Sequence, residues 1–483
     1  MSTRQILCSK QPEVSVQEWA HEEFAELQLG DPRRTRRLIS IMVSVSNQPT
    51  ASIPQACGSW AQTKAAYRFF DNPSVDPDAI LAAHSQKTAQ RAGAHRVILA
   101  LQDTTSLNYS SHPKTQGLGP ISNNPSKTIG FFVHSTLCVT PKGGSVGLAQ
   151  VHRWARDAQS YQKQCQQRNG LPLQKKESHR WLESYHAAQE LAQQCPQTLV
   201  VSVADREGDI YEVLAQATQA TRGQGHAHVL IRSNHNRALC GSQGAKLWEY
   251  LAAAEVAGHS EISVRDRPGA SKARVRLSVR FECVHLKSPI LKKTQADVQL
   301  WAIEAKEENP PSGSQALHWR LLSSLPVESL ESALEKIRWY SQRWQIEEFH
   351  KTLKSGCKIE ERQLETRERL ERLLAVDLIS AWRIMHLTKG ARESPDAPAV
   401  HWLSQEECQA LQAYLSKSQG HKVDDLSLRD AVRSIAKLGG FLGRKGDGQP
   451  GPITLWRGLL RLYDITRCWL LFAQTESPTT RCG

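Results

Sequence analysis

Residues 330–354 read LESALEKIRWYSQRWQIEEFHKTLK, a stretch that we interpret as a helix. An α-helix turns about 100° per residue, which places four polar side chains within about 60° of one another: Tyr340, Arg343, Glu347 and Lys354. One face of this helix therefore offers a carboxylate, two cations and a phenol, a set that can hold a divalent metal ion and a phosphate together. Glu348 points about 100° away from Glu347, so the two carboxylates are not interchangeable.

The same face has a simpler interpretation. Arg343–Glu347 and Glu347–Lys351 have the i,i+4 spacing of ion pairs that decorate a solvated helix. Such a pair stabilises a helix by only about 0.2–0.5 kcal/mol. The helix alone does not decide between these interpretations, and the decision depends on two aspartates elsewhere in the chain.

The composition favours a polyanionic partner. The chain has 483 residues, enough for roughly three domains, and a formal net charge of +13 from 61 Lys and Arg against 48 Asp and Glu. The basic excess is spread along the whole chain, which favours nucleic acid as the partner. A mildly basic enzyme with no such partner is the alternative that charge alone leaves open.

The sequence shows no membrane or disulfide pattern. No apolar run approaches the ~18 residues that span a bilayer, and the N-terminal residues lack a signal-peptide core. The 11 cysteines are scattered and include no CxxC pair. We therefore expect a cytoplasmic protein with reduced thiols, no membrane partner and no cysteine metal site.

Residues 1–75 are predicted to form a helical DNA-binding domain. In the stretch LGDPRRTRRL, Asp31 is a candidate N-cap and Pro32 a candidate first helical residue. Cations at the positive end of a helix are unfavourable unless an anion binds there. The predicted DNA-contacting cations of this region are Arg33, Arg34 and Arg37, together with Arg68 of a second helix. A solvated basic face is the alternative.

From residue 76 onward the pattern becomes mixed α/β. RVILALQD is a predicted strand that ends at Asp103, and TLVVSVADREGD is a predicted strand that ends in acids, with Asp205 first. Residues 128–156 are typical of a hairpin, and residues 259–286 alternate as an arginine-rich β-ribbon does. Residues beyond 370 are helical again.

Three carboxylates from three elements suggest a metal site. Ligands of open α/β sheets bind at the carboxyl ends of strands, where Asp103 and Asp205 are predicted to lie. With Glu347 they supply hard oxygen donors suited to Mg²⁺, with Mn²⁺ as a substitute. Two such ions about 4 Å apart support phosphoryl transfer. A single aspartate at a strand end can equally be a loop cap.

The motifs together resemble those of the DDE cut-and-paste transposases of the insertion-sequence-four family. They are LGDPRRTRRL, AYRFFDNP, LQDTTSLNY, VADREGDI, IRSNH, PVESLESAL, YSQRWQIEEFHKTLKSG and IAKLGGF, in that order between residues 29 and 441. The family signature on its catalytic helix is Tyr, two residues, Arg, three residues, Glu, six residues, Lys. Tyr340, Arg343, Glu347 and Lys354 match every step.

The resemblance implies an α/β fold with a ribonuclease-H-like catalytic core, a β-strand insertion and helical flanking regions. We expect a DNA-binding domain at residues 1–75, a catalytic domain at 76–368 with its insertion at 238–320, and a dimerisation domain at 369–483. The implied catalytic and metal-binding triad is Asp103, Asp205 and Glu347, with two Mg²⁺ ions. The implied phosphate or DNA contacts are Tyr340, Arg343, Lys351, Lys354 and Arg232, with Trp319 stacking on a flipped base.

The implied function is cut-and-paste transposition by a homodimer on double-stranded DNA. The expected steps are a nick at the transposon end, hairpin formation, hairpin opening and strand transfer into target DNA. Two alternatives remain: a catalytically silent DNA-binding derivative, and a ribonuclease-H-fold nuclease or resolvase that cuts without joining. The end sequence and the target preference are not predicted.

Overall fold

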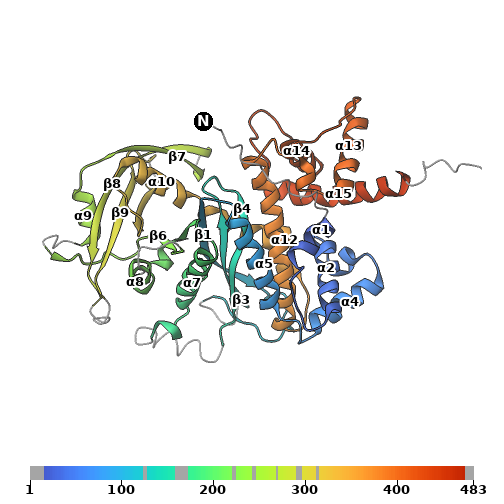
Figure 1. The fold of residues 1–483 in the computed structure, drawn as a ribbon, viewed down its shortest axis with the longest axis horizontal. Helices are drawn as coiled ribbons and strands as arrows, with labels where there is room; N and C mark the ends of the chain where they lie inside the picture. Colours follow the sequence, from blue (N-terminus) through green and yellow to red (C-terminus); the bar gives the residue numbers. More distant parts are fainter. Residues whose placement is uncertain are drawn as a thin grey trace, which may run out of the picture. The chain divides into compact units, whose positions relative to one another are not determined.

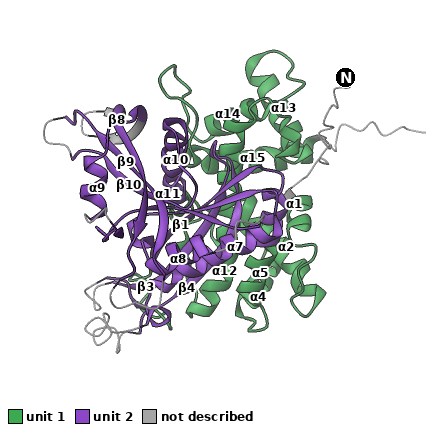
Figure 2. Cartoon of the chain, turned by 60° about the vertical axis from the view of Figure 1, so that its left-hand side comes forward, with its two compact units in different colours: residues 1–84, 107–118, 349–483 green, residues 85–106, 119–348 purple. Residues whose placement is uncertain are grey.

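The computed structural model describes residues 16–122, 128–157, 172–219, 225–241, 246–267, 270–289, 296–311 and 315–473 (Figure 1). The chain forms two compact units, which are coloured separately in Figure 2. One unit comprises residues 85–106 and 119–348, and the other comprises residues 1–84, 107–118 and 349–483. Both are built from segments distant in sequence, so the predicted domain boundaries at 75 and 368 stay predictions.

The unit of residues 85–106 and 119–348 is organised around one mixed sheet. Its strands are β1 (Val97–Asn108), β2 (Gly119–Pro120), β3 (Ile129–Val139), β4 (Ser145–Trp154), β5 (Leu199–Ala204), β6 (His228–Arg232), β7 (Gly258–Arg267), β8 (Ala270–Leu286), β9 (Val298–Glu307) and β10 (His318–Ser323). Their order is β2-β3-β1-β5-β6-β10-β9-β8-β7, and β4 pairs with β3. The predicted hairpin and the mixed α/β class are confirmed.

Three parallel strands form the centre of this sheet. Leu101 of β1 lies opposite Val203 of β5, and Ala204 of β5 lies opposite Ile231 of β6. The part of β1 that pairs with β5, Val97–Leu101, is entirely apolar, and β5 has a single polar residue, Ser202, as is typical of parallel strands covered on both faces. Asp103 is not at the end of its strand as predicted, because β1 continues to Asn108. The aspartate lies two residues beyond the last residue of β1 that pairs with β5.

The predicted β-ribbon extends the same sheet. β7 and β8 pair antiparallel from Gly258–Val279 onward, β8 pairs with β9, and β9 pairs with β10 beside β6. The region 238–320 therefore adds strands in continuity with the central three and includes one short helix, α9 (Leu247–Ala253). Arg265 and Arg267 belong to the ribbon, but their side chains lie outside the described part.

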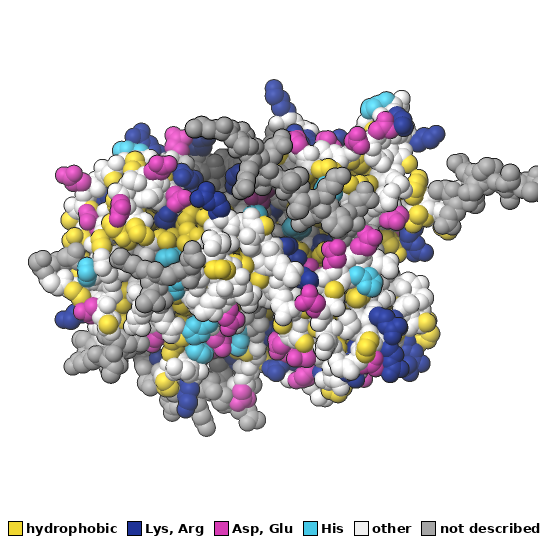
Figure 3. Space-filling view, in the orientation of Figure 1, with side chains coloured by type: hydrophobic (Ala, Val, Ile, Leu, Met, Phe, Trp, Pro, Cys, Tyr) yellow, Lys and Arg dark blue, Asp and Glu magenta, His cyan; other side chains and the backbone are white. Residues whose placement is uncertain are grey.

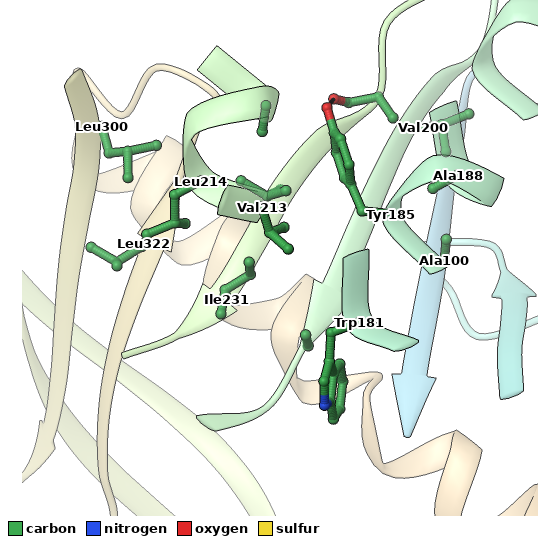
Figure 4. Close-up of a cluster of buried hydrophobic side chains, with 14 of the residues drawn as sticks. Ala100, Trp181, Tyr185, Ala188, Val200, Val213, Leu214, Ile231, Leu300 and Leu322 are labelled. Atoms are coloured by element: carbon green, nitrogen blue, oxygen red, sulfur yellow. Dashed lines mark hydrogen bonds between the residues drawn. The ribbon is translucent and has the colours of Figure 1, made fainter. Parts of the chain in front are cut away.

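Helices cover one face of the sheet. They are α7 (His179–Gln194), α8 (Tyr211–Gln219), α9 and the last turns of α5 (Pro77–Ala92). Figure 4 shows that the core beneath them joins Trp181 and Tyr185 of α7 with strand residues such as Val200 and Ile231. Strand side chains alternate between faces, so Leu99, Leu101, Val201 and Val203 point to the opposite face, and all four are fully buried.

The segment that was predicted to be one helix is interrupted, and its part up to Glu347 lies on the opposite face of the sheet. It is instead α10 (Leu330–Ser341), a turn at Gln342 and Arg343, α11 (Trp344–Lys351) and a π-helical turn, Thr352–Gly356. The buried stripe of α10 runs through Ala333, Ile337 and Tyr340, and its continuation would bury position 344. Trp344 is 49% exposed and Ile346 is fully buried, so the chain turns to present a different face.

The unit of residues 1–84, 107–118 and 349–483 is mainly helical, as predicted for both ends of the chain. Its helices are α1 (Val16–Glu23), α2 (Pro32–Asn47), α3 (Ile53–Cys57), α4 (Trp60–Asp71), α12 (Arg367–Glu393), α13 (Gln405–Gln419), α14 (Leu428–Leu438) and α15 (Pro452–Ala473). α12 packs against α2 and α14. Among the described residues, no helix has the length and apolarity that a membrane crossing requires.

Arg362 forms a buried ion pair with Asp377 in the C-terminal part of this helical unit, and it also bonds to Ala51 in the N-terminal part. Arg362 donates two hydrogen bonds of 3.1 Å to the carboxylate of Asp377 and a third of 2.7 Å to the carbonyl of Ala51. The two side chains are 5% and 0% exposed. Breaking such a pair leaves an uncompensated charge in the interior.

Asp377→Asn should therefore lower the free energy of unfolding by about 3–5 kcal/mol, measured by urea denaturation. The matched control is Asp396→Asn, which removes the carboxylate paired with Arg429 at 2.9 Å on the surface. That control should leave the denaturation midpoint almost unchanged, because exposed pairs contribute little. Equal effects of the two substitutions would contradict the role of the buried pair.

The start of β6 holds a histidine that should make the fold sensitive to acid. Burial, followed by the charges of His226 and Lys336, lowers the pKa of His228 from its ordinary 6.5 to about 4. The folded protein therefore binds this proton less readily than the unfolded chain does. Its contribution to stability is complete above about pH 6.5 and is lost as the pH falls toward 4.

His228→Gln should reduce this acid-dependent loss by roughly 1–3 kcal/mol between pH 6.5 and pH 4, measured by denaturation at each pH. Ser324→Ala is the control, because it removes the hydrogen-bond partner 3.1 Å from Nδ1 but keeps the titrating ring. It should retain the acid-dependent loss. An unchanged pH dependence in His228→Gln would show that the ring is not the responsible group.

Candidate functional site

The two predicted aspartates lie side by side on one face of the sheet. Because Leu101 pairs with Val203 in parallel register, the next residues on the same face are Asp103 and Asp205. Each carboxylate accepts a 2.8 Å hydrogen bond from the following backbone N–H, that of Thr104 for Asp103 and that of Arg206 for Asp205. The two acids are thus anchored at neighbouring points of a rigid sheet.

Arg343 lies among all three predicted acids. Its guanidinium is 2.6 Å from Oε1 of Glu347, 3.6 Å from Oδ2 of Asp103 and 3.7 Å from Oδ2 of Asp205. The side chain is only 14% exposed. Burial alone would lower the pKa of Arg343, but the surrounding Tyr340, Asp205, Glu347 and Asp103 raise it. One cation thus compensates three carboxylates.

The closeness of these acids affects their protonation. The pKa of Asp103 is raised to about 6, first by burial and then by the charges of Glu347 and Asp205, against the opposing effects of the Thr104 N–H and of Arg343. Like charges this close favour a bound cation, because a cation relieves their repulsion. The crowding of negative charge is therefore a property of the site itself.

Tyr340 and Arg232 contact the second aspartate. The hydroxyl of Tyr340 donates to Oδ1 of Asp205 at 3.2 Å, and Nη1 of Arg232 lies 3.7 Å from the same oxygen. Burial, and then the charge of Asp205, raises the pKa of Tyr340, so the phenol stays protonated as a donor. Arg232 also donates to the carbonyl of His318 at 3.0 Å, which holds it against β10.

Trp319 of β10 lies beside this cluster. Its ring meets that of Tyr340 edge to face, with 5.0 Å between ring centroids and 72° between planes. The residue is half-buried, and its strand position places it on the same face as the aspartates. A half-exposed indole held by a second aromatic ring can accept another stacked ring.

The carboxylates suit a hard divalent cation in chemistry, although they do not form a closed cage. Asp103, Asp205 and Glu347 supply oxygen donors of the kind that Mg²⁺ and Mn²⁺ prefer. Within the described ranges, no group of three acid, histidine or cysteine side chains has the arrangement of a ready metal centre. The guanidinium of Arg343 lies between the three acids. A bound cation and this guanidinium would compete for the same oxygens.

Lys351 and Lys354 belong to the other compact unit, and their position relative to the aspartates stays a prediction. Lys351 ends α11 and is exposed, whereas Lys354 lies in the π-helical turn. The ammonium of Lys354 is 3.6 Å from a carboxylate oxygen of Glu360. The expected common face of four residues is thus seen for Tyr340, Arg343 and Glu347.

The basic N-terminal helices have the predicted local structure. Asp31 caps α2 by accepting from the N–H of Arg33 at 2.8 Å, with Pro32 in the first turn. Figure 3 shows Lys and Arg side chains gathered over α2 and α4. Arg33 and Arg68 are exposed, as are Arg36 and Lys64. Arg34 and Arg37 are half-buried and bond to Leu29 and Gln62, so they are partly committed within the protein.

Sequence reasoning missed Arg180 of α7. Its Nε donates to Oγ1 of Thr104 at 2.9 Å, and its Nη2 donates to Oε2 of Glu207 at 2.8 Å. The signal was present, because Arg180 lies in the first turn of a helix, where a cation is unfavourable. The same unfavourable placement occurs at Arg33 in the first turn of α2.

Comparison with protein families assigns the three parts of the chain consistently. Residues 16–75 match a model described as transposase DNA-binding, and residues 164–382 match a transposase DDE domain. Residues 379–468 match a transposase Tn5 dimerisation domain. The DDE domain implies a divalent-metal dependence and a ribonuclease-H-like core for the sheet described above.

Gly208 should be required for the position of Asp205. The turn Arg206–Gly208 follows Asp205 directly, and a Cβ on Gly208 would lie 2.5 Å from Cβ of Ala204 and 3.1 Å from the Trp181 ring. Gly208→Ala should therefore shift this turn, lower the thermal midpoint and weaken Mn²⁺ binding by the protein. Ala204→Gly in the same chain removes the closest contact and should restore part of both. Full tolerance of Gly208→Ala would contradict this packing.

Proposed function

The chain belongs to the Tn5-like DNA transposases of the insertion-sequence-four family, and from this premise we propose that Asp103, Asp205 and Glu347 form its catalytic triad. The observation that carries the proposal is the convergence of these three carboxylates on the guanidinium of Arg343, at 3.6, 3.7 and 2.6 Å. Three acids that are distant in sequence thus contact one largely buried guanidinium on one face of a rigid sheet.

Some properties follow directly from the family. A DDE transposase is a DNA nuclease and strand transferase. The DNA-binding domain makes DNA its partner, and the dimerisation domain makes it a homodimer. We further propose that the DNA consists of the element's inverted-repeat ends and a target duplex, and that the protein acts in the bacterial cytoplasm on the nucleoid.

The proposed reaction is a series of phosphoryl transfers. Water attacks a phosphodiester at the transposon end and leaves a 3′-hydroxyl, which attacks the opposite strand to form a hairpin. A second water opens the hairpin, and the resulting 3′-hydroxyl attacks target DNA. Each step exchanges one P–O bond for another, so one set of side chains can serve all of them.

We propose that the triad holds Mg²⁺, with Mn²⁺ as a substitute and two ions per site. When bound, the ions would supply Lewis-acid stabilisation of the attacking and leaving oxygens. The carboxylates would hold and orient the ions, because β1 and β5 fix Asp103 and Asp205 beside each other. The pKa of about 6 for Asp103 keeps this acid largely ionised at neutral pH.

Arg343 is proposed to exchange partners during the reaction. In the structure the guanidinium of Arg343 contacts the three acids. A planar guanidinium binds phosphate as well as carboxylate. Once released from the acids, the guanidinium would be able to turn to a DNA phosphate at the same place. Tyr340 and Arg232, which contact Asp205, would support the same phosphate. Lys351 and Lys354 are proposed as further phosphate contacts from the following turn.

Trp319 is proposed as the platform for a base flipped out of the duplex. Hairpin formation bends DNA sharply, and an unstacked base needs an aromatic surface worth about 1–3 kcal/mol. Trp319 is half-buried, held edge to face by Tyr340, and on the same face of the sheet as the aspartates. The arginines of the N-terminal helices, Arg33, Arg34, Arg37 and Arg68, are proposed to hold the transposon end.

Alanine at Asp103, Asp205 or Glu347 should reduce nicking of a transposon-end duplex below detection in Mg²⁺, because each removes a cation ligand. The affinity for end DNA, measured by electrophoretic mobility shift, should change little. Glu348→Ala is the matched control, a neighbouring acid that should retain cleavage. An equal loss of DNA binding would identify the three acids as structural.

The same assay separates the alternatives. Nicks followed by hairpins and joining to target DNA support the transposase reaction. Cleavage of branched DNA without joining would support a nuclease or resolvase. Binding without turnover, even in Mn²⁺, would identify a silent derivative.

A further inference from the structure

Arg180 connects the two aspartate-bearing elements from the face of the sheet opposite the acids. Its side chain is only 10% exposed. Nε donates to the Thr104 hydroxyl at 2.9 Å, Nη1 to the carbonyl of Glu177 at 2.7 Å and Nη2 to Glu207 at 2.8 Å. Three of its donors are thus directed to three separate segments of chain.

Two of these partners are joined to the aspartates. The N–H of Thr104 donates to Asp103 at 2.8 Å, and Glu207 lies in the turn that Asp205 caps through its 2.8 Å bond to the N–H of Arg206. Because strand side chains alternate, Thr104 points toward α7 while Asp103 points to the opposite face. Arg180 can therefore hold both β1 and the turn after β5 from the face of the sheet opposite the two carboxylates.

The position of Arg180 is costly unless the contacts compensate for it. The guanidinium lies over the Trp154 and Trp181 rings at 5.3 and 5.6 Å, and it stands in the first turn of α7, near the positive end of the helix dipole. Burial lowers the pKa of Arg180, partly offset by Glu207 and Glu177. Glu207 is 71% exposed, so the bond to Thr104 contributes more than this ion pair.

We propose that Arg180 is a positioning residue that fixes the spacing of Asp103 and Asp205 and thereby sets the affinity of the site for its divalent cation. This inference rests on the proposed function of the triad. Arg343 also bridges the acids, but from the face where DNA is proposed to bind, and it is proposed to leave them. The contacts of Arg180 do not involve Arg343, so they keep the acids spaced when that guanidinium turns to a phosphate.

The test measures Mn²⁺ binding by the full-length protein without DNA, using electron paramagnetic resonance. Arg180→Gln should weaken binding about 10–100-fold, the usual effect of removing a group that orients metal ligands. The concentration of Mg²⁺ that gives half-maximal nicking should rise accordingly, and part of the rate should return at high Mg²⁺. Arg180→Lys should be intermediate, since one ammonium does not reproduce the guanidinium fork.

Arg156→Gln is the matched control. Arg156 is also largely buried, at 16% exposed, and it contacts the same segment through Glu177 at 2.6 Å and the Phe132 ring at 4.3 Å. Its loss should lower the thermal midpoint about as much as Arg180→Gln while leaving Mn²⁺ affinity unchanged. In a double-mutant cycle, Arg180→Gln with Thr104→Val should bind Mn²⁺ no more weakly than Arg180→Gln alone, because each substitution already removes the bond between Arg180 and Thr104.

Unchanged Mn²⁺ affinity in Arg180→Gln would overturn the proposal, as would an equal loss in Arg156→Gln, which would mark a general structural effect. Additive losses in the cycle would also overturn it. Absence of Mn²⁺ binding by the unsubstituted protein would overturn both this inference and the proposed metal site. The transposase reaction is judged separately, by cleavage and joining of DNA, so the two failures are distinguishable.

Discussion

The parallel register of β1 and β5 is the constraint on which the site depends. Leu101 opposite Val203 makes Asp103 and Asp205 the next same-face residues of adjacent strands. Ala204 of β5 lies opposite Ile231 of β6, and both point to the other face. The next residue of β6, Arg232, therefore points to the same face as Asp205. A slip of one residue in either pair would turn a carboxylate to the face covered by α7, away from Arg343 and the other two acids. The apolar residues that fill this core therefore hold the acids in register.

Electrostatics then decides how the assembled acids coexist. Asp103, Asp205 and Glu347 would repel one another, and Arg343 offsets this repulsion from among them. Burial, and to a lesser extent this repulsion, raises the pKa of Asp103. The same carboxylate oxygens are hard donors of the kind that divalent cations prefer, so a bound cation would compete with this guanidinium for them. The arrangement is thus suited to an exchange in which the acids receive metal and the arginine receives phosphate.

Local sequence patterns predicted most elements because they report local physics. The N-cap at Asp31, the hairpin of residues 128–156 and the strand before Asp205 each depend on neighbouring residues alone, and each is confirmed. The unbroken helix over residues 330–354 was wrong. Helical periodicity does not reveal that Trp344 stays exposed while Ile346 is buried, because burial of those residues depends on what packs against them. The prediction that Asp103 ends its strand was also wrong, because β1 continues to Asn108 and the end of a strand depends on what the chain packs against.

By itself, the sequence determined the residue types and their spacings, and hence the family and the candidate acids. The reason is that side-chain chemistry and the geometry of nearby residues depend only on the local sequence. Only the tertiary structure decided that Arg343 lies among Asp103, Asp205 and Glu347, and that Arg180 reaches Thr104 and Glu207 from behind the sheet. These contacts join segments separated by long stretches of chain. Their distances follow from strand register and helix packing, which are properties of the folded whole.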